Sequence, residues 1–307
     1  MATITQDRAA QCDFSAYAAP YQRDGVTFVK NCLDADALKL VQAAYNWKLA
    51  NPGPFAQWLY PDSGATFLQA GGDSIDQPDF NRMLRETPIA KMVADLFGSG
   101  DVWFIGEQLF LKEGGSPTAV SRRTPWHQDS SYLPFEGDKI AVVWIPLDDV
   151  PQAAALEIVK GSHKGVTYNG SMFDKNDDTA PLYLGDPMPR LPDIEGERER
   201  WEKDIVSWAS GPGDALIFHT AALHGGAASL PGMRRRSLTL RFVGDDVVRV
   251  TRPEIRPDTH AVANRDQVKR KHGADAVDTS ERYERLPVGA PLWKSGIRKV
   301  HPWPAAN

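Results

Sequence analysis

The chain has 307 residues and a formal net charge of −5, from 35 lysines and arginines against 40 aspartates and glutamates. Two cysteines are too few for a disulfide-built scaffold or for a thiolate cage around zinc or an iron–sulfur cluster. No apolar run exceeds about six residues, and residues 1–14 lack the apolar core of a secretory signal. The acidic balance gives no reason to bind nucleic acid. We expect a cytoplasmic globular protein whose metal site, if any, uses histidines and carboxylates.

The predicted elements begin with a short apolar strand and continue with two helices. Asp34 is a good N-cap for a helix that runs to about Leu49. Thr87-Pro88 offers a cap and a first-turn proline for a helix over 89–97, which Gly98 ends. Runs rich in β-branched and aromatic residues then predict strands. In chain order, the predicted strands are Val26–Val29, Val102–Lys112, Ile140–Leu147, Leu156–Val159, Asp214–His219 and Ser237–Val243.

Short strands joined by turns of variable length favour a mainly β sandwich or barrel with flanking helices. Strands and helices do not alternate after residue 100, which argues against a doubly wound fold. We expect a single domain over 1–307, with its core at about 22–243. The segments at about 51–79 and 165–200 are long, polar and turn-rich, and we interpret both as lid-like loops. A charged C-terminal extension over about 251–307 is expected to wrap the surface.

The clearest chemical signal is a histidine and an aspartate two residues apart. His127 and Asp129 would point to the same face of a strand and could chelate one metal ion. A third ligand is available from the block at 213–225, which contains His219 and His224. Two histidines and one carboxylate form the facial triad of non-haem Fe(II) oxygenases, which leaves positions open for O2 and a bidentate co-substrate.

Three consecutive arginines follow this block. A guanidinium from Arg234, Arg235 or Arg236 could pair with the far carboxylate of a dicarboxylic acid bound to the metal. Alternation along a strand would send Arg235 to the face opposite its two neighbours, which favours a single arginine at the ligand.

Several blocks in this order resemble the phytanoyl-CoA dioxygenase (PhyH) family of Fe(II)/2-oxoglutarate oxygenases, which includes ectoine hydroxylase. They are Trp126-His127-Gln128-Asp129, the strand Val143-Trp144-Ile145-Pro146-Leu147-Asp148, the segment Ile158-Val159-Lys160-Gly161-Ser162-His163-Lys164-Gly165 with Lys160 in place of the family's usual proline, and the block from Gly213-Asp214 to His224-Gly225. The resemblance covers about residues 22–243. It implies a double-stranded β-helix (jelly roll, cupin-like) core with N-terminal helices packed on one sheet.

The resemblance also implies roles for individual residues. His127, Asp129 and His224 would ligate iron and form the catalytic triad, while His219 would not be a ligand. Arg235, eleven residues past His224, would bind 2-oxoglutarate. The family often has serine and asparagine after the distal histidine and glycine. Here Gly226, Ala227 and Ala228 follow, which leaves no hydroxyl there for a contact to the co-substrate.

Further residues are candidates for the co-substrate site. Gln128 is either a co-substrate contact or a structural hydrogen-bonding residue, and Trp144 is either a wall of the site or part of the core. Gln108 and Lys112, on the strand before the motif, could reach the pocket. Among the other histidines, we expect His163 to fix a turn and we expect His260, His272 and His301 to face solvent.

The function that the resemblance implies is oxidation of a C–H bond of a small organic molecule, by default hydroxylation. It would use Fe(II), O2 and 2-oxoglutarate, with decarboxylation of 2-oxoglutarate to succinate and CO2. Asp129 argues against halogenation, because related halogenases lack this carboxylate so that chloride can bind the iron. Aromatic residues in the two long loops favour a partly apolar substrate, and we expect neither nucleic acid nor a membrane as partner. Two alternatives stay open: a cupin-type metal-dependent isomerase or 2-oxoglutarate-independent dioxygenase, and a non-catalytic binding module.

Overall fold

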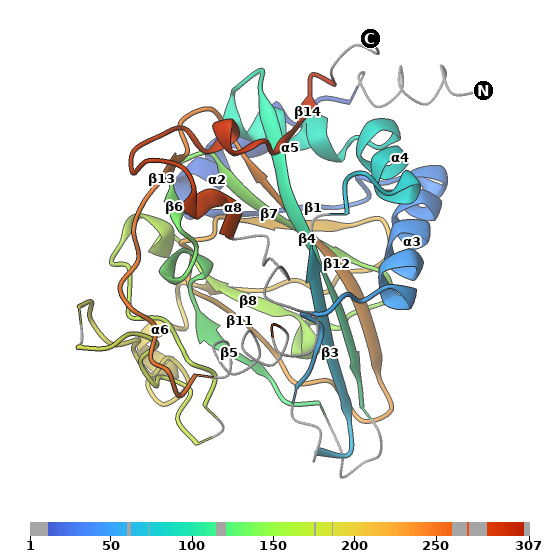
Figure 1. Ribbon diagram of the computed structural model, residues 1–307. Helices are drawn as coiled ribbons and strands as arrows, with labels where there is room; N and C mark the ends of the chain where they lie inside the picture. The colour runs from blue at the N-terminus through green and yellow to red at the C-terminus, as the bar shows by residue number, and fades with distance from the viewer. Residues whose placement is uncertain are drawn as a thin grey trace.

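Two antiparallel sheets face each other in the computed structural model (Figure 1). The structure describes residues 12–59, 63–72, 74–114, 121–174, 176–185, 187–259, 269 and 281–303. The larger sheet has eight strands, in the order β1 (Val26–Val29), β10 (Ala215–Phe218), β7 (Ile140–Pro146), β12 (Arg234–Val243), β4 (Val102–Glu113), β3 (Thr66–Gly72) and β2 (Gln57–Trp58), with β14 (Arg298–His301) beside β4. The smaller sheet has the order β5 (Thr124–His127), β11 (His224–Gly226), β8 (Leu156–Val159) and β9 (Ile205–Val206). A separate pair consists of β13 (Val248–Arg249) and β6 (Phe135–Glu136).

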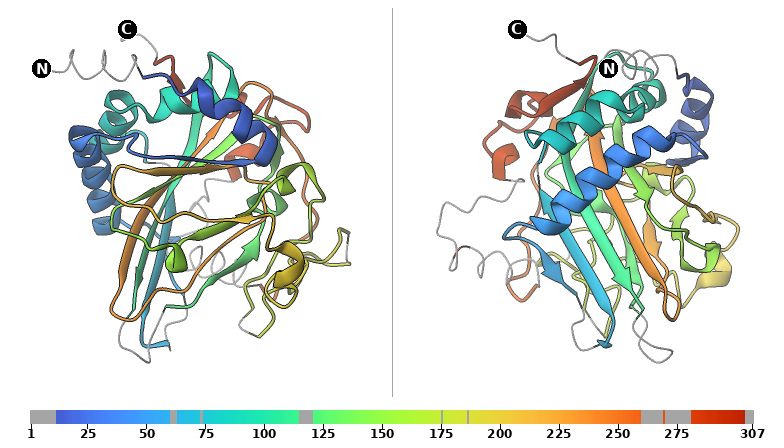
Figure 2. Two further views of the ribbon diagram at one scale, coloured as in Figure 1. Left: turned by 180° about the vertical axis from the view of Figure 1, so that it is seen from behind. Right: turned by 90° about the vertical axis from the view of Figure 1, so that its right-hand side faces the viewer.

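Helices cover the outer face of the larger sheet, and α3 crosses this face obliquely (Figure 2). These are η1 (Ser15–Tyr17), α2 (Ala18–Asp24), α3 (Ala35–Ala50), α4 (Pro78–Glu86) and α5 (Ile89–Phe97). The shorter helical segments are η3 (Asp129–Ser131), η4 (Gln152–Ala154), η5 (Ser162–Lys164), α6 (Arg198–Trp201), α8 (Glu281–Glu284) and η6 (Leu292–Ser295). None of the helices in the described residues is long and apolar enough to cross a bilayer.

Alternation along the strands divides the larger sheet into two faces. On β12, Leu238, Leu240 and Phe242 are fully buried in the main core beneath the helices. The residues between them therefore point toward the smaller sheet. A second core, which includes Trp144 and Ile158, fills part of the space between the two sheets. The face that looks toward the smaller sheet is called the inner face below.

The predicted jelly-roll core, with N-terminal helices packed on one sheet, is confirmed. The Asp34 side chain caps α3 by accepting hydrogen bonds from the backbone N–H groups of Asp36 and Ala37. Gly98 ends α5 in the left-handed region, with φ of 58°. All six predicted strands are present, and β12 begins at Arg234 rather than Ser237 because its pairing with β4 continues to that residue.

Two local predictions were wrong. The segment at 51–79 is not simply a loop, since it contains β2 and all of β3, and β3 pairs along its full length with β4. Because this segment is rich in glycine and polar residues, its sequence did not predict β3, which pairing with β4 stabilises. Thr87 does not cap α5; its hydroxyl donates to the carbonyl O of Met83 at 2.7 Å and closes α4.

The C-terminal extension does more than wrap the surface. It adds β14 to the larger sheet, and Trp293 stacks on Trp103 of β4 with ring centroids 6.0 Å apart. His301 is half-buried in β14, whereas we expected it to face solvent. His260 and His272 lie outside the described residues. The described parts of 165–200 contain isolated bridges and α6 as their regular structure, as expected of a long loop.

A buried ion pair connects α3 to the larger sheet. Lys48 Nζ lies 3.1 Å from Glu107 Oε1, with side chains only 6% and 0% exposed. The carboxylate also accepts hydrogen bonds from the N–H of Ser74 at 3.0 Å and from its hydroxyl at 2.7 Å. Three donors from two separate segments thus converge on one buried charge.

Lys48→Met is therefore expected to lower the free energy of unfolding by about 3 kcal/mol, because it leaves the Glu107 charge buried without its cation. Lys39→Met, on the exposed side of the same helix, is the matched control and should change stability little. Urea unfolding curves measure both. Equal small losses would show that the Lys48 pair does not contribute in this way.

Candidate active site

The three predicted metal ligands lie together between the two sheets. β5 and β11 pair so that His127 stands directly opposite His224, with ring centroids 4.2 Å apart. Asp129 follows at the start of η3, and its Oδ1 lies 3.5 Å from His127 Nε2. All three residues are buried, and one ligand atom from each lies within 4.8 Å of the others. This is the facial arrangement of two histidines and one carboxylate that can hold a divalent ion.

Both histidines are oriented in the same way. His127 Nδ1 lies 2.8 Å from the carbonyl O of Pro125, and His224 Nδ1 lies 2.9 Å from that of Ala222. Each Nδ1–H donates to the carbonyl two residues earlier, so Nε2 carries the lone pair that a metal ion needs. Burial, together with the nearby His127, lowers the pKa of His224 to about 3 and keeps its ring neutral at pH 7.

Two side chains hold the Asp129 carboxylate. Arg241 Nη2 on β12 lies 3.1 Å from Oδ2, and the Tyr132 hydroxyl donates to Oδ1. Burial disfavours the ionised form, but the Arg241 guanidinium beside it holds the pKa of this carboxyl well below its usual value. Asp129 is therefore an oriented anion before any metal binds.

A pair of buried cations lies on the inner face nearby. Arg235 on β12 and Lys112 on β4 are register partners, only 5% and 1% exposed. Lys112 Nζ donates to Thr124 Oγ1 at 3.1 Å, and Arg235 donates to the carbonyl O of Ala154. Neither forms an ion pair with a carboxylate within the described part of the chain.

The pKa values of both groups reflect burial without a carboxylate partner. Burial lowers the pKa of Arg235 to about 10. Burial, with Arg235 and Arg123 nearby, lowers the pKa of Lys112 well below its usual value. Two adjacent buried cations without an acid are unfavourable alone and favourable once an anion binds between them. A carboxylate is the simplest anion that suits both.

The neighbours of Arg235 are placed as alternation predicts. Arg236 is on the other face, where it pairs with Asp148 at 2.7 Å. Arg234 is 54% exposed and lies 3.5 Å from the same carboxylate. The structure thus brings only Arg235 of the three to the inner face.

Gln128 and Trp144 are placed mainly by structural contacts. Gln128 donates to the carbonyl O atoms of Val166 and Ala221, at 3.1 and 2.7 Å, and accepts from the N–H of Tyr168 at 2.9 Å. These bonds tie β5 to the 165–200 segment and favour the structural alternative for Gln128. Trp144 is 5% exposed in the core between the sheets. Its register partner Thr239 has a buried hydroxyl without a partner in the described structure, so a polar ligand atom would fit beside this pair.

His219 lies apart from the metal ligands. Its Nδ1 accepts from the N–H of Ala221 at 3.0 Å, and its Nε2 donates to the carbonyl O of Gly137 at 3.1 Å. Both nitrogens are therefore used within the fold, which agrees with a core histidine. His163, in η5, lies 3.3 Å through Nε2 from the carbonyl O of Gln22, so it connects this turn to α2.

One residue of the 165–200 segment reaches the metal ligands. Phe173 packs its ring edge-to-face on His127, with centroids 5.2 Å apart. It has a positive φ of 56°, which is uncommon outside glycine, and it is 36% exposed. Its N–H donates to Ser171 Oγ at 3.0 Å, which helps to hold this conformation. The segment therefore places an aromatic side chain over the candidate metal site.

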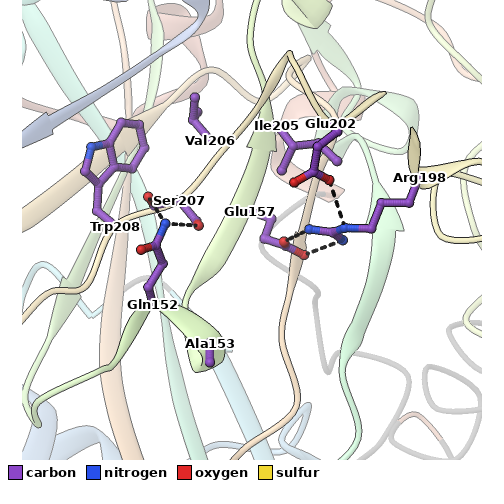
Figure 3. Close-up of a pocket in the computed structure, with 9 residues that line it drawn as sticks. All are labelled: Gln152, Ala153, Glu157, Arg198, Glu202, Ile205, Val206, Ser207 and Trp208. Atoms are coloured by element: carbon purple, nitrogen blue, oxygen red, sulfur yellow. Dashed lines mark hydrogen bonds and ion pairs between the residues drawn. The ribbon is translucent and has the colours of Figure 1, made fainter. Parts of the chain in front are cut away.

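A hollow beside β8 and β9 of the smaller sheet is a separate feature (Figure 3). It has a volume of about 440 Å³ and is lined by Gln152, Ala153, Glu157, Arg198, Glu202, Ile205, Val206, Ser207 and Trp208. Arg198 there pairs with both Glu157 and Glu202. Because this cation is already neutralised and none of the three metal ligands lines the hollow, it is not the candidate active site.

Comparison with known proteins identifies the family. The model of the phytanoyl-CoA dioxygenase (PhyH) family matches residues 21–237. The chain belongs to this family. A probable phytanoyl-CoA dioxygenase of Caenorhabditis elegans is 24% identical over 252 residues, which are 76% of each chain.

Solved structures share the fold of this family member at low sequence identity. The epimerase SnoN, crystallised with Fe3+, α-ketoglutarate and nogalamycin RO, is 19% identical with a TM-score of 0.61, over 94% of this chain and 98% of its own. The carbocyclase SnoK from nogalamycin biosynthesis is 16% identical with a TM-score of 0.60, over 92% and 94%. EctD from S. alaskensis, with 2-oxoglutarate and 5-hydroxyectoine, is 18% identical with a TM-score of 0.52, over 75% and 76%.

The chain is thus an oxygenase of the PhyH family, and its residues fit the cofactors of this class. His127, Asp129 and His224 could bind iron through two imidazole nitrogens and one carboxylate. The unneutralised Arg235 and Lys112 pair fits the far carboxylate of 2-oxoglutarate. Thr239, whose hydroxyl has no partner in the described structure, is four residues after Arg235 on the same strand and therefore on the same face.

Three residues at the site were missed in the sequence. Arg241 and Thr239 continue the alternation that starts at Arg235, so the period of the strand could have revealed them. Tyr132 comes from an irregular segment, and its contact with Asp129 has no periodic signal. Phe173 is one of the loop aromatics that the sequence placed near the substrate, although its contact with His127 could not be predicted.

His219 gives the fold a predictable pH dependence. Burial lowers its pKa to about 4 from 6.5, and a proton on Nδ1 would also face the Ala221 N–H. The unfolded chain therefore binds more protons between these values, and stability falls as the pH drops from about 6.5 toward 4. His219→Gln should remove about 2 kcal/mol of the loss between pH 7 and pH 5, measured by urea unfolding at both values. An unchanged slope would refute this role.

Proposed function

We propose that the chain uses Fe(II), O2 and 2-oxoglutarate to oxidise a C–H bond of a small organic molecule, with hydroxylation as the default outcome. The observation that carries the proposal is the buried triad beside a buried pair of cations without an acid. The triad suits a divalent ion with open positions, and the cations suit a dicarboxylate that also reaches the ion. Neither feature has a structural purpose that is evident without these ligands.

The residues of the site would have the following roles. His127, His224 and Asp129 would hold the ion, and Pro125, Ala222, Arg241 and Tyr132 keep them in a ligating orientation. Arg235, assisted by Lys112, would bind the far carboxylate of 2-oxoglutarate. Bound there, Fe(II) and 2-oxoglutarate would supply the oxidising chemistry, which would consume O2 and release succinate and CO2. Phe173 would shield the site from water and orient the substrate.

Three features bear on the reaction and on the substrate. Asp129 occupies the ligand position that a halogenase would leave to chloride, so we propose oxidation rather than halogenation. The solved relatives include proteins named as an epimerase and a carbocyclase, so the fold alone does not select hydroxylation. Phe173 gives the site an apolar side, which supports a partly apolar small molecule as substrate. The 165–200 segment, which carries Phe173, would be its lid.

The first test is turnover of 2-oxoglutarate with Fe(II) under air, followed as O2 uptake and succinate formation. His127→Ala should lower this turnover by about 100-fold or more, because the ion loses a ligand. His219→Gln is the matched control and should retain turnover, since His219 is not in the triad. Activity of His127→Ala equal to that of the parent would refute the metal site. A parent that responds to metal but not to 2-oxoglutarate, in turnover or thermal stability, would favour the cupin-type alternative.

The second test separates the arginines of β12. Arg235→Ala should raise the Michaelis constant for 2-oxoglutarate by about 10- to 100-fold, because a charge-assisted hydrogen bond to its carboxylate is lost. Arg236→Ala, one residue away on the opposite face, should leave this constant nearly unchanged. Equal effects of the two substitutions would contradict the assignment of Arg235.

A further inference from the structure

A row of polar side chains crosses the inner face of the larger sheet, starting at a predicted metal ligand. Arg241 Nη2 bonds to Asp129 Oδ2 at 3.1 Å and to Gln108 Oε1 at 2.9 Å. Gln108 Nε2 donates to Gln69 Oε1 at 3.2 Å, and Gln69 Nε2 donates to Gln57 Oε1 at 2.8 Å. The row takes one residue from each of β12, β4, β3 and β2. It therefore extends from the candidate metal site to the edge of the sheet.

The row retains unused hydrogen-bonding capacity. Gln108 and Gln69 each use one donor and one acceptor within the row, which leaves each amide a second N–H and a second lone pair. Arg241 is engaged through Nη2, and its Nε and Nη1 have no partner in the described structure. These nitrogens are not sealed from solvent, and the side chain is 17% exposed. Donors beside the metal ligands are thus available to a bound molecule.

The net positive charge around Arg241 favours the binding of an anion. Asp129 is its one acid partner in the described structure, and this carboxylate would share its charge with a bound divalent ion. The ion, Arg241, Arg235, Asp129 and a 2-oxoglutarate dianion together leave one positive charge, even with Lys112 neutral. Because 2-oxoglutarate would pair with Arg235, the remaining positive charge leaves Arg241 available to a second anion.

The backbone is also specialised at this point. The pairing of β12 with β4 shifts register just after Arg241, and Gly106 lies opposite Arg241 with φ of 143°. A Cβ at Gly106 would lie 2.5 Å from the carbonyl O of Gly72, so a larger residue would push β3 away. Such irregularities often re-aim a side chain at a functional site. Here the irregularity lies where Arg241 meets Asp129.

We propose that Arg241 binds a carboxylate of the organic substrate, with Gln108 and Gln69 lining the same side of the substrate site. This inference rests on the proposed function, because it places the substrate beside the iron and 2-oxoglutarate. Arg241 touches Asp129, so the C–H bond to be oxidised lies close to that carboxylate in the substrate. Phe173, packed on His127, supplies an apolar surface for the remainder of the molecule. The substrate class is a carboxylic acid with an apolar body.

The experiment uses the anaerobic complex of the full-length protein with Fe(II) and 2-oxoglutarate. Phenylacetate, 3-phenylpropionate and hexanoate are each titrated beside the corresponding primary amide. Binding is followed by the change in the visible charge-transfer absorption of the complex. At least one acid should bind about tenfold or more tightly than its amide, because only the acid gains a charge-assisted contact with Arg241.

Three variants test the assignment. Arg241→Gln should abolish the preference for the acid. Gln108→Glu should also abolish the preference for the acid, because it places an internal carboxylate against Arg241. This second variant tests the assignment even if Arg241→Gln no longer forms the complex with Fe(II) and 2-oxoglutarate. Arg236→Gln, on the opposite face of the same strand, is the matched control and should keep the preference.

The outcomes separate the two proposals. If the parent does not form the absorbing complex with Fe(II) and 2-oxoglutarate, the proposed function fails. If the complex forms but no acid perturbs it, or acid and amide bind alike, the inference about Arg241 fails alone. A preference that survives in Gln108→Glu also overturns it.

Discussion

The structure depends above all on the alternation of side chains along β12. Leu238, Leu240 and Phe242 are fully buried beneath the helices, and their neighbours Arg235, Thr239 and Arg241 point to the inner face. A slip of one residue would bring the charged set into the core and the leucines into the active site. Pairing with β4 along the full strand, and with β7 from Ser237 onward, prevents such a slip. Core stability and site chemistry are therefore specified by the same register.

The inner face shows how a fold prepares a site for charged ligands. Arg235 and Lys112 are buried together without an acid, an arrangement that is unfavourable until an anion binds. The proposed metal ligands are prepared differently, since backbone carbonyls fix the two imidazoles and Arg241 fixes the carboxylate. One part of the site is thus satisfied within the protein, whereas the other lacks its counter-ion. This contrast separates the proposed metal ligands from the residues proposed to bind the co-substrate.

Much of the fold could be predicted because its signals are local. The cap at Asp34, the stop at Gly98 and the apolar strand runs each depend on a few adjacent residues. β3 could not be predicted, since its glycines and polar residues form a strand only against β4. Thr87 was predicted to cap α5, but its hydroxyl donates to the carbonyl O of Met83 and ends α4 instead.

The sequence by itself determined the kind of site. A spacing of two residues across the extended Gln128 brings Asp129 beside His127, although Asp129 itself begins η3. Alternation along β12 singles out Arg235. Only the tertiary structure decided the rest. It brings His224 rather than His219 against His127, places Lys112 opposite Arg235, and joins Arg241 to Asp129. It also places Phe173 over the metal ligands. These contacts join segments far apart in the chain, and no local pattern encodes such distances.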